Sequence, residues 1–222
     1  SVTVFAKCHH GMCYFPTKTG TPHPALRGRD LLGEMIEALH REDIRAPIYT
    51  TIAWDEEIAR KFPQWRQMHR DGTFARSRNT DHTKPPHPGA WHFNDWINPD
   101  YQDLIESHVR ELCGRFPVDG LFFDIVFYAR DAHWSAAARA FRERHKLTGA
   151  DDETFRRFES LAQDRFGARF TRLVRGLKRN ASVFYNSGFE VLMDSTVGGR
   201  VRARHMTHLE FESLPSGFWG YY

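Results

Sequence analysis

Short strand-like runs alternate with longer helix-like stretches along this 222-residue chain. Runs of β-branched and aromatic residues predict strands at residues 2–6, 46–52, 121–126, 182–186 and 207–212. Apolar residues at helical spacing predict helices at residues 29–42, from Pro99 to about 112, at 134–147 and at 152–178. Strands that alternate with helices form parallel βαβ units. We therefore expect an α/β fold built on a parallel sheet.

The ends of the predicted strands distinguish between two α/β architectures, the doubly wound sheet and the barrel. No Gly-rich phosphate loop follows the first strand. Each predicted strand instead ends at polar, acidic or aromatic side chains: His9 and His10, Trp54 and Asp55, Asp124, Asn186, and Glu212. Functional groups at the carboxyl ends of many strands are typical of a TIM barrel. A complete (β/α)8 barrel needs eight strands and about 250 residues, so five strands predict one truncated catalytic domain over residues 1–222.

Composition excludes several other classes of protein. The 31 Lys and Arg residues nearly balance 28 Asp and Glu residues and are scattered, so no nucleic-acid footprint is indicated. No apolar run is long enough to predict a transmembrane helix or a membrane partner. Three cysteines without metal-site spacing indicate a reducing compartment. Because no signal peptide is visible, we expect a cytoplasmic protein whose true N-terminus lies upstream of Ser1.

Asp124 is the most informative single residue, because it lies inside an otherwise apolar run. Leu121, Phe122 and Phe123 precede it, and Ile125 follows it. A buried carboxylate costs several kcal/mol unless it is paired or hydrogen-bonded. Two interpretations follow: Asp124 is a reacting group, or it is a structural residue satisfied by an Arg or by backbone N–H groups.

A second set of acids lies in the last predicted strand. Side chains alternate along a strand, so Glu210 and Glu212 share a face with His208. Glu212 is nearer the carboxyl end and therefore nearer the expected active face. Carboxyl groups from two different strands are what glycoside hydrolysis requires. The alternative is that one of these glutamates only holds a His or Arg inside the barrel.

Other strand-end residues suggest contacts with a sugar. His9 and His10 are adjacent and point in opposite directions in an extended chain, which favours hydrogen bonds to hydroxyl groups over a metal site, or a plain polar loop. Trp54 and Trp219 are candidates for stacking on a sugar ring, or for packing, and Asn186 for binding a hydroxyl or closing a turn. No metal site and no cofactor are predicted. Three histidines in a Pro-rich loop are expected to be solvated: His82, His87 and His92.

Four segments carry a resemblance to a known family: Phe5–Gly11, Asp30–Met35, Val118–Tyr128 and Thr207–Tyr221. In this order they resemble the hypothetical glycosyl hydrolase 6 family, which is similar to the α-L-fucosidases of glycoside hydrolase family 151. The third and fourth segments are the more specific ones. The resemblance implies a TIM-barrel catalytic domain of which this chain covers about strands 2 to 6. It also implies a β-galactosidase trimerisation-like domain beyond the chain, and hence a homo-oligomer through that missing domain.

The resemblance also implies a retaining mechanism. Asp124 matches the position of the nucleophile, and Glu212 or Glu210 lies in the motif expected to supply the general acid/base. Positions that match the sugar site are His9, His10, Trp54 and Asn186. The leading hypothesis is a retaining exo-glycosidase such as an α-L-fucosidase, with a carbohydrate as its partner. The alternatives are a carbohydrate-binding or catalytically degenerate barrel, and a metal-dependent hydrolase that uses some of the 13 histidines.

Overall fold

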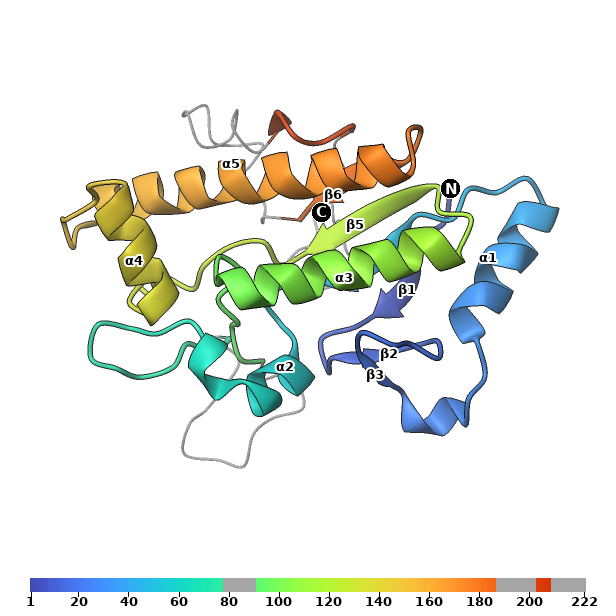
Figure 1. Ribbon diagram of the computed structural model, residues 1–222, viewed down its shortest axis with the longest axis horizontal. Coiled ribbons are helices and arrows are strands. Elements are labelled where there is room, and N and C mark those ends of the chain that lie inside the picture. Colours follow the sequence, from blue (N-terminus) through green and yellow to red (C-terminus); the bar gives the residue numbers. More distant parts are fainter. Residues whose placement is uncertain (78–90, 187–202, 209–222) are drawn as a thin grey trace, which may run out of the picture.

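The computed structural model describes residues 1–77, 91–186 and 203–208, which form a mixed α/β fold around a six-stranded sheet (Figure 1). The strands, in chain order, are β1 (Val4–Lys7), β2 (Met12–Cys13), β3 (Thr21–Pro22), β4 (Ile48–Thr51), β5 (Gly120–Asp124) and β6 (Ser182–Tyr185). Their order in the sheet is β3-β2-β1-β4-β5-β6. Strands β1, β4, β5 and β6 pair in parallel, so their carboxyl ends lie along one edge.

The helices are α1 (Leu31–Arg41), α2 (Glu56–Lys61), α3 (Pro99–Arg115), α4 (Ala136–Arg144) and α5 (Asp152–Leu177), with two short 3-10 helices at Pro24–Leu26 and Pro63–Trp65. Side-chain caps explain where several of them begin. Asp30 accepts a hydrogen bond from the N–H of Gly33 at 2.9 Å, and Asp151 accepts one from Thr154 at 2.7 Å. Figure 1 shows α3 and α5 side by side across the sheet. None of the helices in the described ranges has the length and apolar character needed to cross a membrane.

Side-chain alternation gives the sheet two different faces. Leu121 and Phe123 of β5 are buried among the core residues, and Phe123 contacts Phe166 and Phe170 of α5. Phe122, between them in sequence, points to the other face. Full burial of one such side chain contributes about 1.5–3 kcal/mol to folding. The helix-covered face is therefore a large part of the hydrophobic core.

The other face carries a row of aromatic rings in strand register. Phe5 is paired with Tyr49, Tyr49 with Phe122, and Phe122 with Phe184. Successive ring centroids lie 4.3, 5.3 and 4.9 Å apart. Phe5 is 42% exposed at the β1 end of the row. Because Tyr49 belongs to this row, its hydroxyl is carried on the face away from the helices.

Most of the predicted elements are confirmed. The strands expected at 2–6, 46–52, 121–126 and 182–186 correspond to β1, β4, β5 and β6, and all four predicted helices are present. The parallel pairing expected of these strands is confirmed, and the sheet also includes β2, which runs antiparallel to β1. The sequence analysis missed β2, β3 and α2, which are too short to show a periodic pattern.

The strand predicted at 207–212 falls mostly outside the described residues. Its first two residues, Thr207 and His208, lie in a bend rather than in a strand. The N–H of Thr207 donates to the carbonyl of Val183 at 2.9 Å, so this bend lies alongside β6.

Candidate active site

Asp124 is the last residue of β5, and side chains from three neighbouring strands converge on it. His9 follows β1, Tyr49 lies in β4, and Asn186 follows β6. The Asp124 side chain is only 7% exposed. The parallel strands bring these four residues together because their carboxyl ends share one edge of the sheet. The sequence had singled out Asp124, His9 and Asn186 from this position alone.

Both carboxylate oxygens of Asp124 have hydrogen-bond partners. Oδ1 accepts from Nδ2 of Asn186 at 2.8 Å. Oδ2 accepts from the Tyr49 hydroxyl and lies 3.0 Å from Nε2 of His9. Within the described part of the chain, no Lys or Arg forms an ion pair with Asp124. Asp124 is therefore a carboxylate oriented by an amide, a phenol and an imidazole. The described residues do not form the alternative arrangement, in which an Arg binds a structural aspartate.

The backbone directly after Asp124 is strained. Ile125 has a φ of 59°, in the left-handed region that β-branched residues rarely adopt. Hydrogen bonds hold it there, with Ile52 N–H donating to the Asp124 carbonyl at 2.9 Å and Ala53 N–H to the Ile125 carbonyl at 3.1 Å. Strain of this kind costs about 1–3 kcal/mol and is concentrated at functional sites. It is an independent observation that marks this strand end.

Tyr49 is a site residue that the sequence analysis did not identify. Burial, together with the nearby Asp124 charge, raises the pKa of its phenol well above the usual value, so the hydroxyl stays protonated and donates. Its oxygen also lies 2.8 Å from Nε2 of His9. The sequence does place Tyr49 in a predicted strand, two residues before the end of β4. Its side chain also points to the opposite face from those of Ile48 and Thr50.

Two tryptophans enclose His9. The Trp54 and Trp91 rings meet the imidazole edge-on, with centroids at 5.0 and 5.6 Å. Nε1 of Trp54 is buried and has no hydrogen-bond partner among the described residues. Trp54 therefore lies beside His9, as its strand-end position suggested. Trp91, which precedes the buried part of its loop, lies beside His9 as well. Together the two rings form an apolar boundary beside His9, whose Nε2 lies 3.0 Å from Oδ2 of Asp124.

An ion pair and a helix terminus hold the turn that carries His9. Nζ of Lys7 donates to Oδ2 of Asp55 at 2.7 Å, and both side chains are buried. Asp55 also caps α2 through the N–H of Ile58 at 3.0 Å. Gly11 has a φ of 82° and packs so tightly that a Cβ would lie 2.3 Å from Oδ1 of Asp55. This contact requires glycine and fixes the turn against α2.

Other predicted site residues lie elsewhere. His10 turns away from Asp124, as its alternation with His9 implied, and its Nε2 lies 3.0 Å from the Tyr14 hydroxyl. His208 is exposed, with its ring 5.8 Å from that of Phe184 in the aromatic row. The remaining three predicted site residues lie outside the described residues: Glu210, Glu212 and Trp219.

His92 corrects one expectation from the sequence, and His82 and His87 lie outside the described residues. His92 is buried rather than solvated. Its ring Nδ1 lies 3.0 Å from Oε2 of Glu56, which replaces contact with water. Burial raises the pKa of Glu56, but the hydrogen bonds from His92 outweigh it and lower that pKa overall. Glu56 is therefore held as an anion, which does not suit a general acid.

In the ranges that the structure describes, no three His, Cys, Asp or Glu residues are grouped so that they could hold a metal ion.

The comparisons with known proteins identify the family and the fold. The model of a family described as hypothetical glycosyl hydrolase 6 matches residues 1–125, a stretch that ends just after Asp124. A search of curated proteins finds no match. Among solved structures, α-L-fucosidase isoenzyme 2 from Paenibacillus thiaminolyticus is 32% identical with a TM-score of 0.81, over 99% of this chain and 31% of its own.

Two more distant structures share the fold alone. The cold-adapted β-galactosidase from Rahnella sp. R3 is 15% identical with a TM-score of 0.57, over 82% of this chain and 30% of its own. The chitobiase of Flavobacterium johnsoniae is 12% identical with a TM-score of 0.50, over 82% of this chain and 26% of its own. The chain spans less than a third of the length of each of these proteins. With the family model matched over more than half of its residues, the chain belongs to the hypothetical glycosyl hydrolase 6 family.

Proposed function

We propose that this chain is the core of a retaining exo-glycosidase that acts on α-L-fucosides, with Asp124 as its nucleophile. The observation that carries the proposal is a buried carboxylate at a strand end that is bonded at both oxygens, one of them to a histidine bordered by two tryptophans. The α-L-fucosidase that is 32% identical supports the choice of sugar. The partner is a carbohydrate.

In this mechanism Asp124 attacks the anomeric carbon while the bond to the leaving oxygen breaks. The general acid donates a proton to that oxygen, and a covalent glycosyl-enzyme forms. A water molecule, deprotonated by the same residue, then attacks the anomeric carbon and releases Asp124. Asn186, Tyr49 and His9 orient the carboxylate for attack, while Trp54 offers an N–H group for a sugar hydroxyl.

The general acid/base is proposed to be Glu212, with Glu210 as the other candidate. The described acids at this edge support the choice indirectly, because Asp55 is paired with Lys7 and Glu56 with His92. Retention requires the two carboxyl groups to be about 5–5.5 Å apart. Trp219 is proposed to border the same site.

The proposal also includes the architecture that brings these residues together. A (β/α)8 barrel, of which β1, β4, β5 and β6 are consecutive strands, closes the site around the carboxyl edge. Homo-oligomer formation through a following domain belongs to the same proposal.

The test is hydrolysis of 4-nitrophenyl α-L-fucoside by the protein and by its Asp124→Ala variant. We expect the variant to lose turnover by about 10⁴-fold or more, because the covalent step has no nucleophile. Sodium azide should restore part of the rate and give a fucosyl azide product. The exposed Asp103→Asn variant on α3 is the matched control and should hydrolyse normally. A fully active Asp124→Ala variant contradicts the assignment.

A carbohydrate-binding protein without turnover is the second candidate. One observation favours it. The other described acids near Asp124 are already paired, Asp55 with Lys7 and Glu56 with His92. L-fucose would then raise the melting temperature while wild-type protein released no sugar from any α-L-fucoside.

A further inference from the structure

A second cleft lies apart from the Asp124 cluster, between the β2–β3 loop, α2 and α3, and has a volume of about 500 Å³. Lys7, Asp55 and His108 are among its lining residues, whereas Asp124, Tyr49, His9 and Asn186 are not. Figure 1 shows α2 and the β2–β3 strands on the same side of α3. The cleft is therefore a separate recess in the fold and has no part in the proposed hydrolysis.

His108 offers an unpaired acceptor at this cleft. The Thr19 hydroxyl donates to Oε2 of Glu111 at 2.6 Å, so its oxygen accepts from Nδ1 of His108 at 3.1 Å. The proton of the neutral imidazole is thus on Nδ1, and Nε2 presents a lone pair. Nε2 has no hydrogen-bond partner among the described residues, although His108 is only 4% exposed. A buried polar atom without a partner costs about 1–3 kcal/mol, so this acceptor favours a donor from a ligand.

Lys7 offers unused donors at the same cleft. Its ammonium group has three N–H donors, and the described partner is Asp55, at 2.7 Å. Lys7 is 8% exposed and is close enough for its charge to lower the pKa of His108, together with burial, to about 3. A hydroxyl group both accepts and donates, so the hydroxyls of one ligand can accept from Lys7 and donate to His108.

One wall of the cleft is aromatic. The Trp65 ring stacks on Phe62, at a centroid distance of 4.0 Å, and its centroid lies 5.9 Å from that of Tyr101. All three rings line the cleft, and Trp65 and Phe62 are partly exposed. Flat apolar rings beside a few convergent polar groups are typical of small-molecule sites. The C–H face of a sugar ring fits against such a wall.

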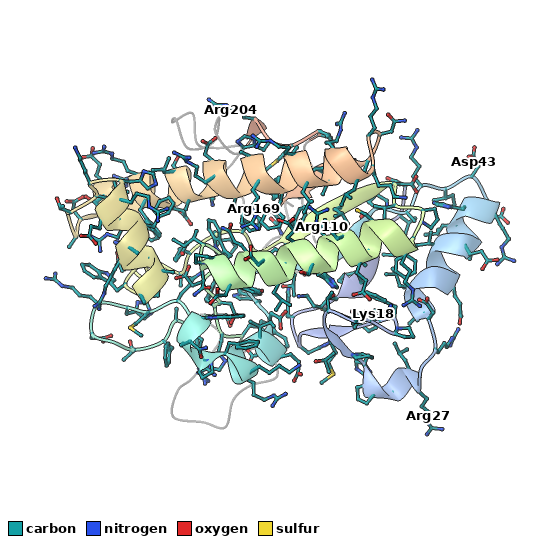
Figure 2. All side chains as sticks on the ribbon, viewed as in Figure 1. Lys18, Arg27, Asp43, Arg110, Arg169 and Arg204 are labelled. Carbon is teal, nitrogen blue, oxygen red and sulfur yellow. The ribbon has the colours of Figure 1, made fainter. Side chains whose placement is uncertain are left out.

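The charges of the lining indicate a ligand without net charge. Three lysines and four carboxylates line the cleft. Two of the lysines are already neutralised, because Lys7 pairs with Asp55 and Lys61 lies 3.4 Å from Glu57. Lys18, labelled in Figure 2, lines the same cleft as Asp100 and Asp103 of α3. A phosphate or other anion would meet these carboxylates, whereas a neutral polyol would not.

We propose that the cleft between the β2–β3 loop, α2 and α3 is a second carbohydrate-binding site, which holds a neutral sugar ring against Trp65 with its hydroxyls on Lys7 and His108. Such a site retains a glycan on the protein without cleaving it. The proposal is independent of the hydrolytic role of Asp124.

The site is tested by ¹⁵N-HSQC titration of the protein with L-fucose, with lactose and with inorganic phosphate. At least one sugar should shift the amides of Thr19 and Ser107 and the indole N–H of Trp65, in wild type and in Asp124→Ala alike. Phosphate should leave these signals in place. Sugar shifts that are confined to the Asp124 cluster, or shifts of the cleft by phosphate alone, overturn the proposal.

Two variants that keep the core intact locate the site. Ser107→Trp places a large ring in the cleft from an exposed position of α3 and should weaken sugar binding at least tenfold. Arg110→Trp, on the α5 side of the same helix (Figure 2), is the matched control and should bind as wild type does. Trp65→Ala should also weaken binding tenfold or more. Unchanged binding in both Ser107→Trp and Trp65→Ala contradicts the proposal.

Discussion

Two buried aspartates in this protein have similar partners and different surroundings. Asp124 accepts from the Tyr49 hydroxyl, and Asp95 accepts from the hydroxyls of Tyr128 and Ser135. Asp95 is fully buried, and Ser135 is also the cap of α4. Asp124 lies instead at a strand end, within hydrogen-bond distance of a histidine that two tryptophan rings enclose. Burial against a tyrosine therefore does not by itself favour a catalytic role, and the proposal for Asp124 depends on its position at the carboxyl edge of the sheet.

The largest expected difference between the two aspartates is in turnover, and the Asp124→Asn variant should show it. We expect turnover of an aryl α-L-fucoside to fall by about 10⁴-fold, with the free energy of unfolding lowered by about 1–3 kcal/mol, because the amide keeps the size of the side chain but replaces one accepting oxygen by an NH2 group. Asp95→Leu is the counterpart and should lower stability by about 2–5 kcal/mol, since two buried hydroxyls lose their acceptor. Initial rates and urea denaturation measure both. The comparison fails if Asp124→Asn unfolds the protein and Asp95→Leu does not.

Removing Lys7 should give the next largest effect. Lys7→Met leaves Asp55 buried without its cation, which costs about 3–5 kcal/mol of stability. The double variant Lys7→Met/Asp55→Asn should recover part of this loss, because the amide oxygen still caps α2. Thermal unfolding of the single and double variants measures the coupling. Equal stability of Lys7→Met and wild type would show that the pair has no role in holding the His9 turn.

The pH dependence of stability should reveal Asp95. Burial raises the pKa of Asp95 to about 6, against about 3.9 in the unfolded chain. Between pH 4 and 6 the folded state therefore binds more protons, and this residue lowers stability as the pH rises, by about 3 kcal/mol in all. Asp95→Asn should remove this contribution. Urea unfolding at pH 4, 5, 6 and 7 compares the two proteins, and parallel curves would contradict the prediction.

Tyr49→Phe should have the smallest of these effects. Asp124 loses one hydrogen bond to its Oδ2 but keeps those to His9 and Asn186. A bond to a charged group contributes about 1.5–3 kcal/mol, so kcat should fall about tenfold to hundredfold, with KM nearly unchanged. The control is Tyr14→Phe, because the hydroxyl of Tyr14 contacts His10 and not Asp124. This variant should have the kcat of the wild type. A rise in KM alone would place Tyr49 on the sugar rather than on the nucleophile.

Much of the fold was predictable because its signals are local. Helical periodicity located α1, α3, α4 and α5, and apolar runs located β1, β4, β5 and β6. The strands of two residues, β2 and β3, carry no such period, and their pairing depends on contacts between distant segments. His92 was misjudged for the same reason, because its partner Glu56 is 36 residues away in sequence.

The sequence by itself determined that a carboxylate ends an apolar strand, since alternation and burial are properties of neighbouring residues. It also placed His9, Trp54 and Asn186 at the ends of other strands. Only the tertiary structure decided that Tyr49 and His9 share one oxygen of Asp124, that Trp91 borders His9, and that His10 turns away. Those relations depend on strand register and on turns held by Lys7 and Asp55, and no short-range pattern encodes which distant side chains will meet.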